Sequence, residues 1–217
     1  MSENATVAGY IFDDGALLAQ AMKHPSTHKS NNNQRLEFLG DAVLGLVIAE
    51  ALYAQYPDEQ EGELARRQAA LVRGETLVGL AEGMALGEHL QLSQSEAQAG
   101  GRSTASNLED ACEALIGAIY LDGGLDAAKA WVLTHWQPLI ESITEPPKDP
   151  KTALQEWAQG RGLGLPLYEV VGQSGPAHAP EFIISVAVEN HGDAKASAGS
   201  KKQAEQLAAA ALLEKLT

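Results

Sequence analysis

The 217-residue sequence contains one cysteine, few aromatic residues and no long hydrophobic run. The single cysteine, Cys112, allows no intramolecular disulfide, which is typical of proteins that work in a reducing compartment. The best apolar run, residues 42–49, ends at Glu50 and is too short to cross a bilayer. Residues 1–15 carry acids and no apolar core of the kind that a secretory signal needs. These absences predict a soluble, cytoplasmic protein with no membrane partner.

The sequence is also poor in positive charge. It has 15 basic and 29 acidic residues, a net charge of −14, whereas nucleic-acid-binding proteins are usually basic. The acidic excess lies in the first part of the chain. Residues 1–147 carry eight basic and 21 acidic side chains, and residues 148–217 carry seven and eight. If the protein binds a nucleic acid, the second part must therefore provide most of the attraction.

Two acids interrupt an apolar segment in the first part. Glu37 and Asp41 lie four residues apart, next to Leu36 and Phe38. This spacing predicts that both carboxylates lie on one face of a helix. Buried like charges are costly unless a cation or proton compensates them, and Mg²⁺ or Mn²⁺ suits two hard oxygen ligands. The alternative is a helix whose acids only reach solvent or pair with Arg35.

A second acidic pair strengthens the metal interpretation. Asp110 and Glu113 have helical i, i+3 spacing in another apolar segment. Ser106 and Glu109 predict a capping box, which would give Glu109 a structural role. Two such helices can form a four-carboxylate site for one or two divalent ions that act on phosphate. A di-iron bundle would instead need Glu-x-x-His, and no glutamate here has histidine three residues later.

Three motifs together resemble bacterial ribonuclease III: RLEFLGD at 35–41, LVRGETL at 71–77 and LEDACEALIGAIYLDGG at 108–124. The resemblance covers nearly the whole chain. It implies an all-helical nuclease domain, a homodimer, no organic cofactor, and Mg²⁺-dependent cleavage of double-stranded RNA, with Mn²⁺ as a substitute ion.

The resemblance also assigns residues. It implies four essential acids, with Asp41 and Glu113 as catalytic residues and Glu37, Asp110 and Glu113 as metal ligands. Glu61 matches a further acid near the cleavage valley. Gln34 occupies a position where many relatives carry glutamate, and an amide cannot supply that charge. We expect Gln34 to make a polar contact at the subunit interface.

Two further sets of residues can be explained by structural roles. His24 and His28 have no acidic or histidine partner at ligand spacing, so we expect a structured loop there. Arg66, Arg67 and Arg73 either contact phosphates or pair with Glu63 and Glu75.

A proline-rich break separates the two parts of the chain. Pro146, Pro147 and Pro150 interrupt the helical patterns, which is typical of a short stiff linker. We expect a nuclease and dimerisation domain at 1–145, a linker at 146–150 and a second domain at 151–217. Asp149 before Pro150 predicts a helix start. That helix, to about residue 159, precedes strand-like segments at 167–171, 181–188 and 193–198 and a helix at 200–216, in the order α-β-β-β-α.

The second part resembles a double-stranded RNA-binding domain, through the motif AGSKKQAEQ at 198–206. Ser200 is placed to cap a helix whose N-terminus attracts phosphate. Lys201 and Lys202 oppose the helix dipole there, which favours a role in RNA binding. The resemblance implies further contacts in the first helix and in the loop after the first strand, at Thr152, Gln155, Glu156, Gly175, Pro176 and His178. Such a domain recognises A-form shape with little sequence reading.

The sequence thus predicts an all-α nuclease domain followed by a small α+β domain that binds double-stranded RNA. The resemblance implies products with 5′-phosphate and 3′-hydroxyl ends, and precursor ribosomal RNA and structured messenger RNA as substrates. The alternative is a non-cleaving RNA-binding regulator whose nuclease-like domain only dimerises. The presence of all four acids argues against that alternative.

Overall fold

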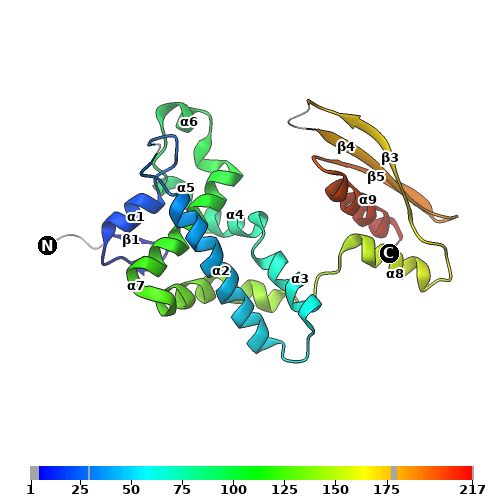
Figure 1. The fold of residues 1–217 in the computed structure, drawn as a ribbon, viewed down its shortest axis with the longest axis horizontal. Helices are drawn as coiled ribbons and strands as arrows, with labels where there is room; N and C mark the ends of the chain where they lie inside the picture. The colour runs from blue at the N-terminus through cyan, green and yellow to red at the C-terminus, as the bar shows by residue number, and fades with distance from the viewer. Residues whose placement is uncertain (1–4, 29, 177–179, 217) are drawn as a thin grey trace. The chain divides into compact units, whose positions relative to one another are not determined.

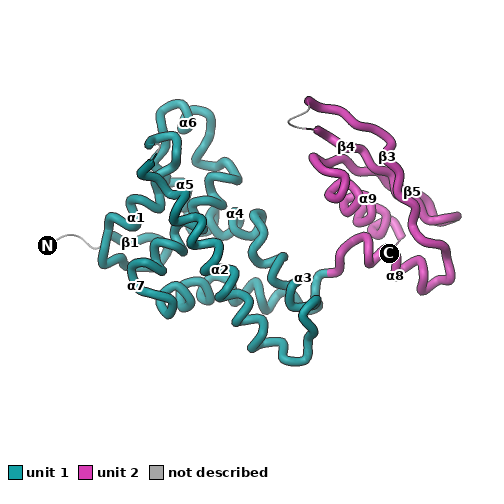
Figure 2. The backbone as a smooth tube through the Cα atoms, viewed as in Figure 1, with its two compact units in different colours: residues 1–147 teal, residues 148–217 magenta. Residues whose placement is uncertain are grey.

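The computed structural model describes residues 5–28, 30–176 and 180–216 (Figure 1). The chain divides into two units, Met1–Pro147 and Lys148–Thr217 (Figure 2). No helix within the described ranges is both long and apolar enough to cross a membrane.

Two long helices form the centre of the first unit. Helix α2 (Gln34–Gln55) crosses α7 (Ala105–Ser142), and Figure 1 draws them in blue and green. Helices α1 (Gly15–Ala21) and α4 (Gly74–Gly83) pack against α7, and α3 (Glu61–Leu71) packs against α2. The remaining elements are short: β1 (Thr6–Val7), β2 (Tyr10–Ile11), α5 (Leu86–His89), α6 (Gln94–Gln98) and the 3₁₀ helix η1 (Gly101–Ser103). The first unit is therefore helical, as expected, with one small hairpin.

The crossing of α2 and α7 depends on glycine. A Cβ atom on Gly40 would overlap the carbonyl oxygen of Glu113, and one on Gly117 would overlap that of Leu36. Around this contact the two helices bury large apolar side chains, including Leu44, Ile48, Leu115 and Ile116. The backbones can approach only because neither glycine carries a side chain.

The start of α7 differs from the expectation. The helix begins at Ala105 after Thr104, so the predicted capping box of Ser106 and Glu109 is wrong. The carboxylate of Glu109 lies instead against Gly74 at the start of α4, where a Cβ atom would be 2.7 Å from its oxygens. A negative charge at a helix N-terminus is favourable, so this contact offers Glu109 a better position than the predicted cap.

The second unit has the expected order α-β-β-β-α. Helix α8 (Pro150–Gln159) precedes β3 (Leu167–Ser174), β4 (Glu181–Val188), β5 (Gly192–Ala198) and α9 (Lys201–Leu216). The strands form an antiparallel sheet in sequence order, with a bulge in β3 between Val170 and Gly172. Helix α9 packs on β4 and β5, and α8 packs on α9.

The predicted N-cap residues of the two helices in this unit are confirmed. The Asp149 carboxylate accepts hydrogen bonds from the N–H groups of Lys151 and Thr152, with Pro150 in the first turn of α8. The Ser200 hydroxyl accepts from the N–H of Gln203 and caps α9.

Candidate active site and RNA interface

The contact of α2 with α7 brings the two predicted acid pairs into one region. Gly40 lies between Glu37 and Asp41 in sequence, and it touches the backbone of Glu113. Burial raises the pKa of Glu37, and the charges of Asp110, Glu109 and Asp41 raise it further. The acids of α7 are therefore close enough to those of α2 for their charges to shift the pKa of Glu37.

Glu113 is the most perturbed acid of this group. Burial raises its pKa to about 7, with further contributions from the charges of Asp41, Glu109, Glu37 and Asp110. Burial also raises the pKa of Asp110, although the charge of His24 opposes that shift. Burial is the largest cause of these shifts, and for Glu37 and Glu113 the neighbouring carboxylates add to it, which marks a site where negative charge is not fully compensated.

The donor set fits a hard divalent ion. All four side chains offer carboxylate oxygens, and a cation among them would relieve the repulsion that raises the pKa values. Within the described ranges, however, no three His, Cys, Asp or Glu side chains are arranged as a ready metal site. The carboxylates thus share a region without forming a closed ligand set, and side chains must move for an ion to be enclosed.

Two residues of this region were given other roles from the sequence. Glu109 is a fifth acid, and its charge raises the pKa of both Glu37 and Glu113. His24 lies in a structured loop, as expected, and its Nδ1 accepts a hydrogen bond from the N–H of Ser26 at 3.1 Å. Its charge nevertheless reaches Asp110. The adjacency of Glu109 and Asp110 was visible in the sequence, whereas the approach of His24 depends on the fold.

Glu61 does not join the four acids within one chain. It is exposed at the start of α3 and lines a groove of about 450 Å³ with Leu52, Tyr53 and Leu64. Its charge is not among those that shift the pKa of Glu37 or Glu113. Gln34 is exposed at the start of α2.

An exposed apolar stripe runs along α2 on the side away from the core. Phe38, Leu46 and Tyr53 are 81%, 56% and 76% exposed, and Ala42 and Ala49 lie between them at helical spacing. Large exposed apolar side chains in a contiguous row are characteristic of an interaction surface.

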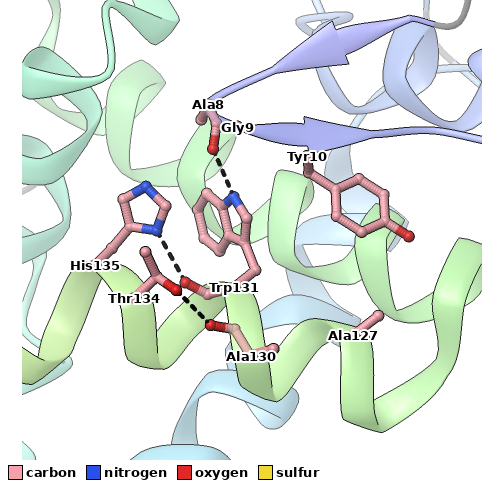
Figure 3. A pocket seen from close by; sticks show the side chains of 8 residues that line it. All are labelled: Ala8, Gly9, Tyr10, Ala127, Ala130, Trp131, Thr134 and His135. Atoms are coloured by element: carbon pink, nitrogen blue, oxygen red, sulfur yellow. Dashed lines mark hydrogen bonds between the residues drawn. The ribbon is translucent and has the colours of Figure 1, made fainter.

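A second groove, of about 540 Å³, lies away from the acids (Figure 3). The Ala8–Gly9 turn and the later half of α7 line it. The indole N–H of Trp131 donates to the carbonyl of Ala8, and Nδ1 of His135 is 2.9 Å from the carbonyl of Trp131. No carboxylate lines this groove, so it does not compete with the acids as a candidate active site.

The predicted RNA-binding residues lie on the exposed surface of the second unit. Lys201 and Lys202 are exposed in the first turn of α9, and the Lys201 ammonium is 5.7 Å from the Phe182 ring centroid. Ala198, at the end of β5, pairs with Phe182 at the start of β4. The N-terminus of α9 and the start of β4, which follows the β3–β4 connection in the chain, therefore meet at one end of the sheet. His178, predicted in that connection, lies outside the described residues.

Three further predicted contacts lie on α8. Thr152, Gln155 and Glu156 are all exposed. Glu156 forms an ion pair with Lys148 at 2.9 Å. This pair was not expected from the sequence, and it lowers the cost of an acid near a phosphate backbone.

Comparison with known proteins agrees with this geometry. Residues 14–139 match the family described as ribonuclease-III-like, and residues 150–216 match the double-stranded RNA binding motif. Ribonuclease 3 of Wolbachia pipientis subsp. Culex pipiens (strain wPip) is 47% identical over 216 residues, covering 97% of this chain and 94% of that protein. Ribonuclease 3 of Jannaschia sp. (strain CCS1) is 50% identical over 210 residues, with coverage of 96% and 92%.

The first unit is also similar to a solved nuclease domain of ribonuclease III. The nuclease domain of ribonuclease III from Campylobacter jejuni, described for structural flexibility in a region involved in dimer formation, aligns with a TM-score of 0.57. It is 43% identical and covers 62% of this chain and 92% of its own. The chain matches a ribonuclease-III-like domain and a double-stranded RNA binding motif, and relatives of this identity cover nearly its full length. It therefore belongs to the ribonuclease III family and is an endoribonuclease of that type.

Proposed function

We propose that this protein cleaves double-stranded RNA in the presence of Mg²⁺ at the acids of the α2–α7 crossing, leaving 5′-phosphate and 3′-hydroxyl ends. The observation that carries the proposal is the close contact of α2 and α7 at Gly40 and Glu113, which brings the two acid pairs into one region. Burial and the neighbouring carboxylates there raise the pKa of Glu113 to about 7. A site with this much uncompensated negative charge is suited to a divalent cation, and a cation-bound site is suited to a phosphodiester.

The four acids divide into two roles in this proposal. Glu37, Asp110 and Glu113 would hold the ion, with Mn²⁺ able to replace Mg²⁺ because both prefer oxygen ligands. When bound, the ion lowers the pKa of water and neutralises charge on the phosphate oxygens. Asp41, which is exposed, and Glu113 would orient the attacking water and accept its proton. Glu61 remains a secondary acid, outside this group in a single chain.

The proposed active form is a homodimer built on α2. The stripe of Phe38, Leu46 and Tyr53 is too apolar to remain in water on a stable monomer. A twofold contact uses the same patch on both subunits, so each stripe can cover the other. Two copies carry two acid sites, one for each strand of a duplex. In this arrangement residues 1–145 form the nuclease and dimerisation domain, followed by a linker at 146–150.

The second domain, residues 151–217, provides most of the binding to RNA. The first part of the chain carries an excess of acids and would repel phosphate. Lys201 and Lys202 add positive charge at the N-terminus of α9, where free N–H groups also attract phosphate. The proposed contacts are Thr152, Gln155, Glu156, His178, Ser200, Lys201 and Lys202. A domain of this type follows the A-form minor groove, so duplex stems of precursor ribosomal RNA and structured messages in the cytoplasm are the proposed substrates.

A labelled RNA hairpin tests the proposal. The protein should cut the stem with Mg²⁺ or Mn²⁺, and chelation should stop the reaction. The 5′ ends of the products should accept no new phosphate from a kinase until a phosphatase has removed the existing one. If the hairpin binds tightly with Ca²⁺ but stays intact with Mg²⁺, the protein is instead a non-cleaving regulator.

A further inference from the structure

Arg67 of α3 has an environment unlike that of the other arginines. Its side chain is 2% exposed, and it is the only buried charged side chain in the part of the chain that the structure describes. Glu59 accepts three of its hydrogen bonds, from Nε to Oε2 at 2.8 Å and to Oε1 at 3.1 Å, and from Nη2 to Oε1 at 2.6 Å. The guanidinium also lies over the Tyr56 ring, 3.8 Å from its centroid. The α2–α3 corner therefore holds the guanidinium rigidly.

The remaining donors of Arg67 point to the end of α7. Nη1 donates to the carbonyl of Ile143, and Nη2 lies 3.5 Å from the carbonyl of Thr144. Carbonyls at the end of a helix lack partners within the helix, and a cation there is favoured by the helix dipole. A core ion pair alone would need only Glu59. Arg67 instead ties the last residues of α7 to α2 and α3.

The chain leaves the first unit directly after this attachment. Residues 145–148, two of them proline, separate Thr144 from Asp149, which caps α8. Arg67 thus lies at the origin of the tether that carries the RNA-binding unit. We propose that Arg67 is a positioning residue: it fixes where the tether begins and so sets the length of the tether that carries the RNA-binding unit. This inference rests on the proposed function, in which the second unit holds RNA for the first.

The expected size of the effect follows from the next attachment along α7. The Tyr56 hydroxyl donates to the carbonyl of Ile140 at 3.1 Å. Without Arg67 the tether could begin after Ile140, which lengthens it from four residues to eight. Once a tether is longer than the span it bridges, effective concentration falls roughly as the −3/2 power of its length, so doubling the length lowers it about threefold. The Ile143 side chain also packs against the core, which makes threefold the upper figure.

The test uses the full-length double variant Glu59→Gln/Arg67→Met. Removing both charges avoids leaving one buried charge without its partner. We expect the KM for hairpin cleavage to rise two- to threefold with kcat unchanged, and amide hydrogen exchange at residues 141–145 to increase. Arg66→Met, which removes an exposed arginine of the same helix, is the matched control, and it should keep the carbonyl contacts of Arg67 and the native KM.

A second variant separates tether length from stability. Four residues, Gly-Ser-Gly-Ser, inserted between Thr144 and Glu145 leave Arg67 intact and should raise the KM by the same factor. An unchanged KM in both variants would overturn the inference. If the wild-type protein cuts no RNA, the proposed function fails, whereas unchanged hydrogen exchange at residues 141–145 in the double variant would overturn the anchor by itself.

Discussion

Gly40 of α2 lies against the carbonyl oxygen of Glu113 in α7, so closely that a Cβ atom at position 40 would overlap it. This contact fixes the spacing of the two helices at the level of the acids. The chemistry of the site therefore depends on a residue that has no functional group.

Replacing Gly40 with alanine should separate the helices. Overpacking of this kind costs about 1–3 kcal/mol of stability, and it should also reduce hairpin cleavage, because Glu37 and Asp41 would move relative to Glu113. Gly79, in α4, is the matched control, since a Cβ atom there would meet open space. Gly79→Ala should raise the free energy of unfolding by about 0.5–1 kcal/mol. Chemical denaturation of both variants checks this, and a Gly40→Ala protein as stable and active as the wild type would contradict it.

The stability of the metal-free protein should depend on Glu113. Its pKa is about 7 in the folded protein against an ordinary value of 4.5. Between these values the folded state keeps a proton that the unfolded state releases, so the free energy of unfolding falls as pH rises through this window. Glu113→Gln removes this loss. We expect it to stabilise the metal-free protein at pH 8 by about 1–2 kcal/mol, after allowing for solvent screening of a half-buried group.

Thermal unfolding with a chelator, between pH 4 and pH 8, measures that difference. The advantage of Glu113→Gln should shrink as pH falls and vanish below about pH 4.5, where both states of the wild type are protonated. Added Mg²⁺ should stabilise the wild type at pH 8 more than the variant. A variant less stable than the wild type at pH 8 would mean that Glu113 is compensated within the protein.

The exposed stripe on α2 should be required for dimerisation. An arginine at position 46 would place a charge in the middle of an apolar contact that both subunits share. We expect Leu46→Arg to sediment as a monomer of 22.9 kDa at micromolar concentration, while the wild type sediments at twice that mass. Leu207 on α9 is exposed to a similar degree as Leu46, so Leu207→Arg is the control and should remain dimeric. A monomeric wild type would end the dimer proposal.

The paired lysines of α9 should dominate RNA binding. Lys201→Ala with Lys202→Ala should weaken hairpin binding, and each lost phosphate contact should reduce the log–log salt slope by about 0.9, taking the duplex-DNA value for duplex RNA. Lys195→Ala, which removes another exposed lysine of the same unit, should leave the slope nearly unchanged. Titration over a salt series with Ca²⁺ in place of Mg²⁺ keeps the RNA intact. Equal salt slopes for the double variant and the control would mean that other residues bind the RNA.

The order of elements could be predicted because its signals are local. Spacing of acids and apolar residues gave the helices that carry Glu37 and Glu113, and Asp149 and Ser200 were identified as caps from their neighbours alone. The cap at Ser106 was wrong for a tertiary reason. Glu109 had a competing partner at Gly74, more than thirty residues earlier in the chain, and local sequence cannot report such a contact.

Side-chain partners across the fold were the least predictable feature. Arg67 was expected to contact phosphate or to pair with Glu63 or Glu75, yet it is buried against Glu59 and the end of α7. Its spacing on α3 does not distinguish it from Arg66, which is exposed. Only the packing of α3 beside the end of α7 decides between them. The roles of the four acids in catalysis stay predictions, because the described acids share a region without forming a closed metal-ligand set.

Cleavage of a 5′-labelled RNA hairpin by wild type and Glu113→Gln, each with Mg²⁺, tests the central claim most directly. The wild type should cut the stem and leave 5′-phosphate and 3′-hydroxyl ends. Glu113→Gln should bind the same hairpin with similar affinity and leave it intact, because the lysines of the second unit are unchanged. Comparable cleavage by both proteins would contradict the assignment of the acids at the α2–α7 crossing as the active site.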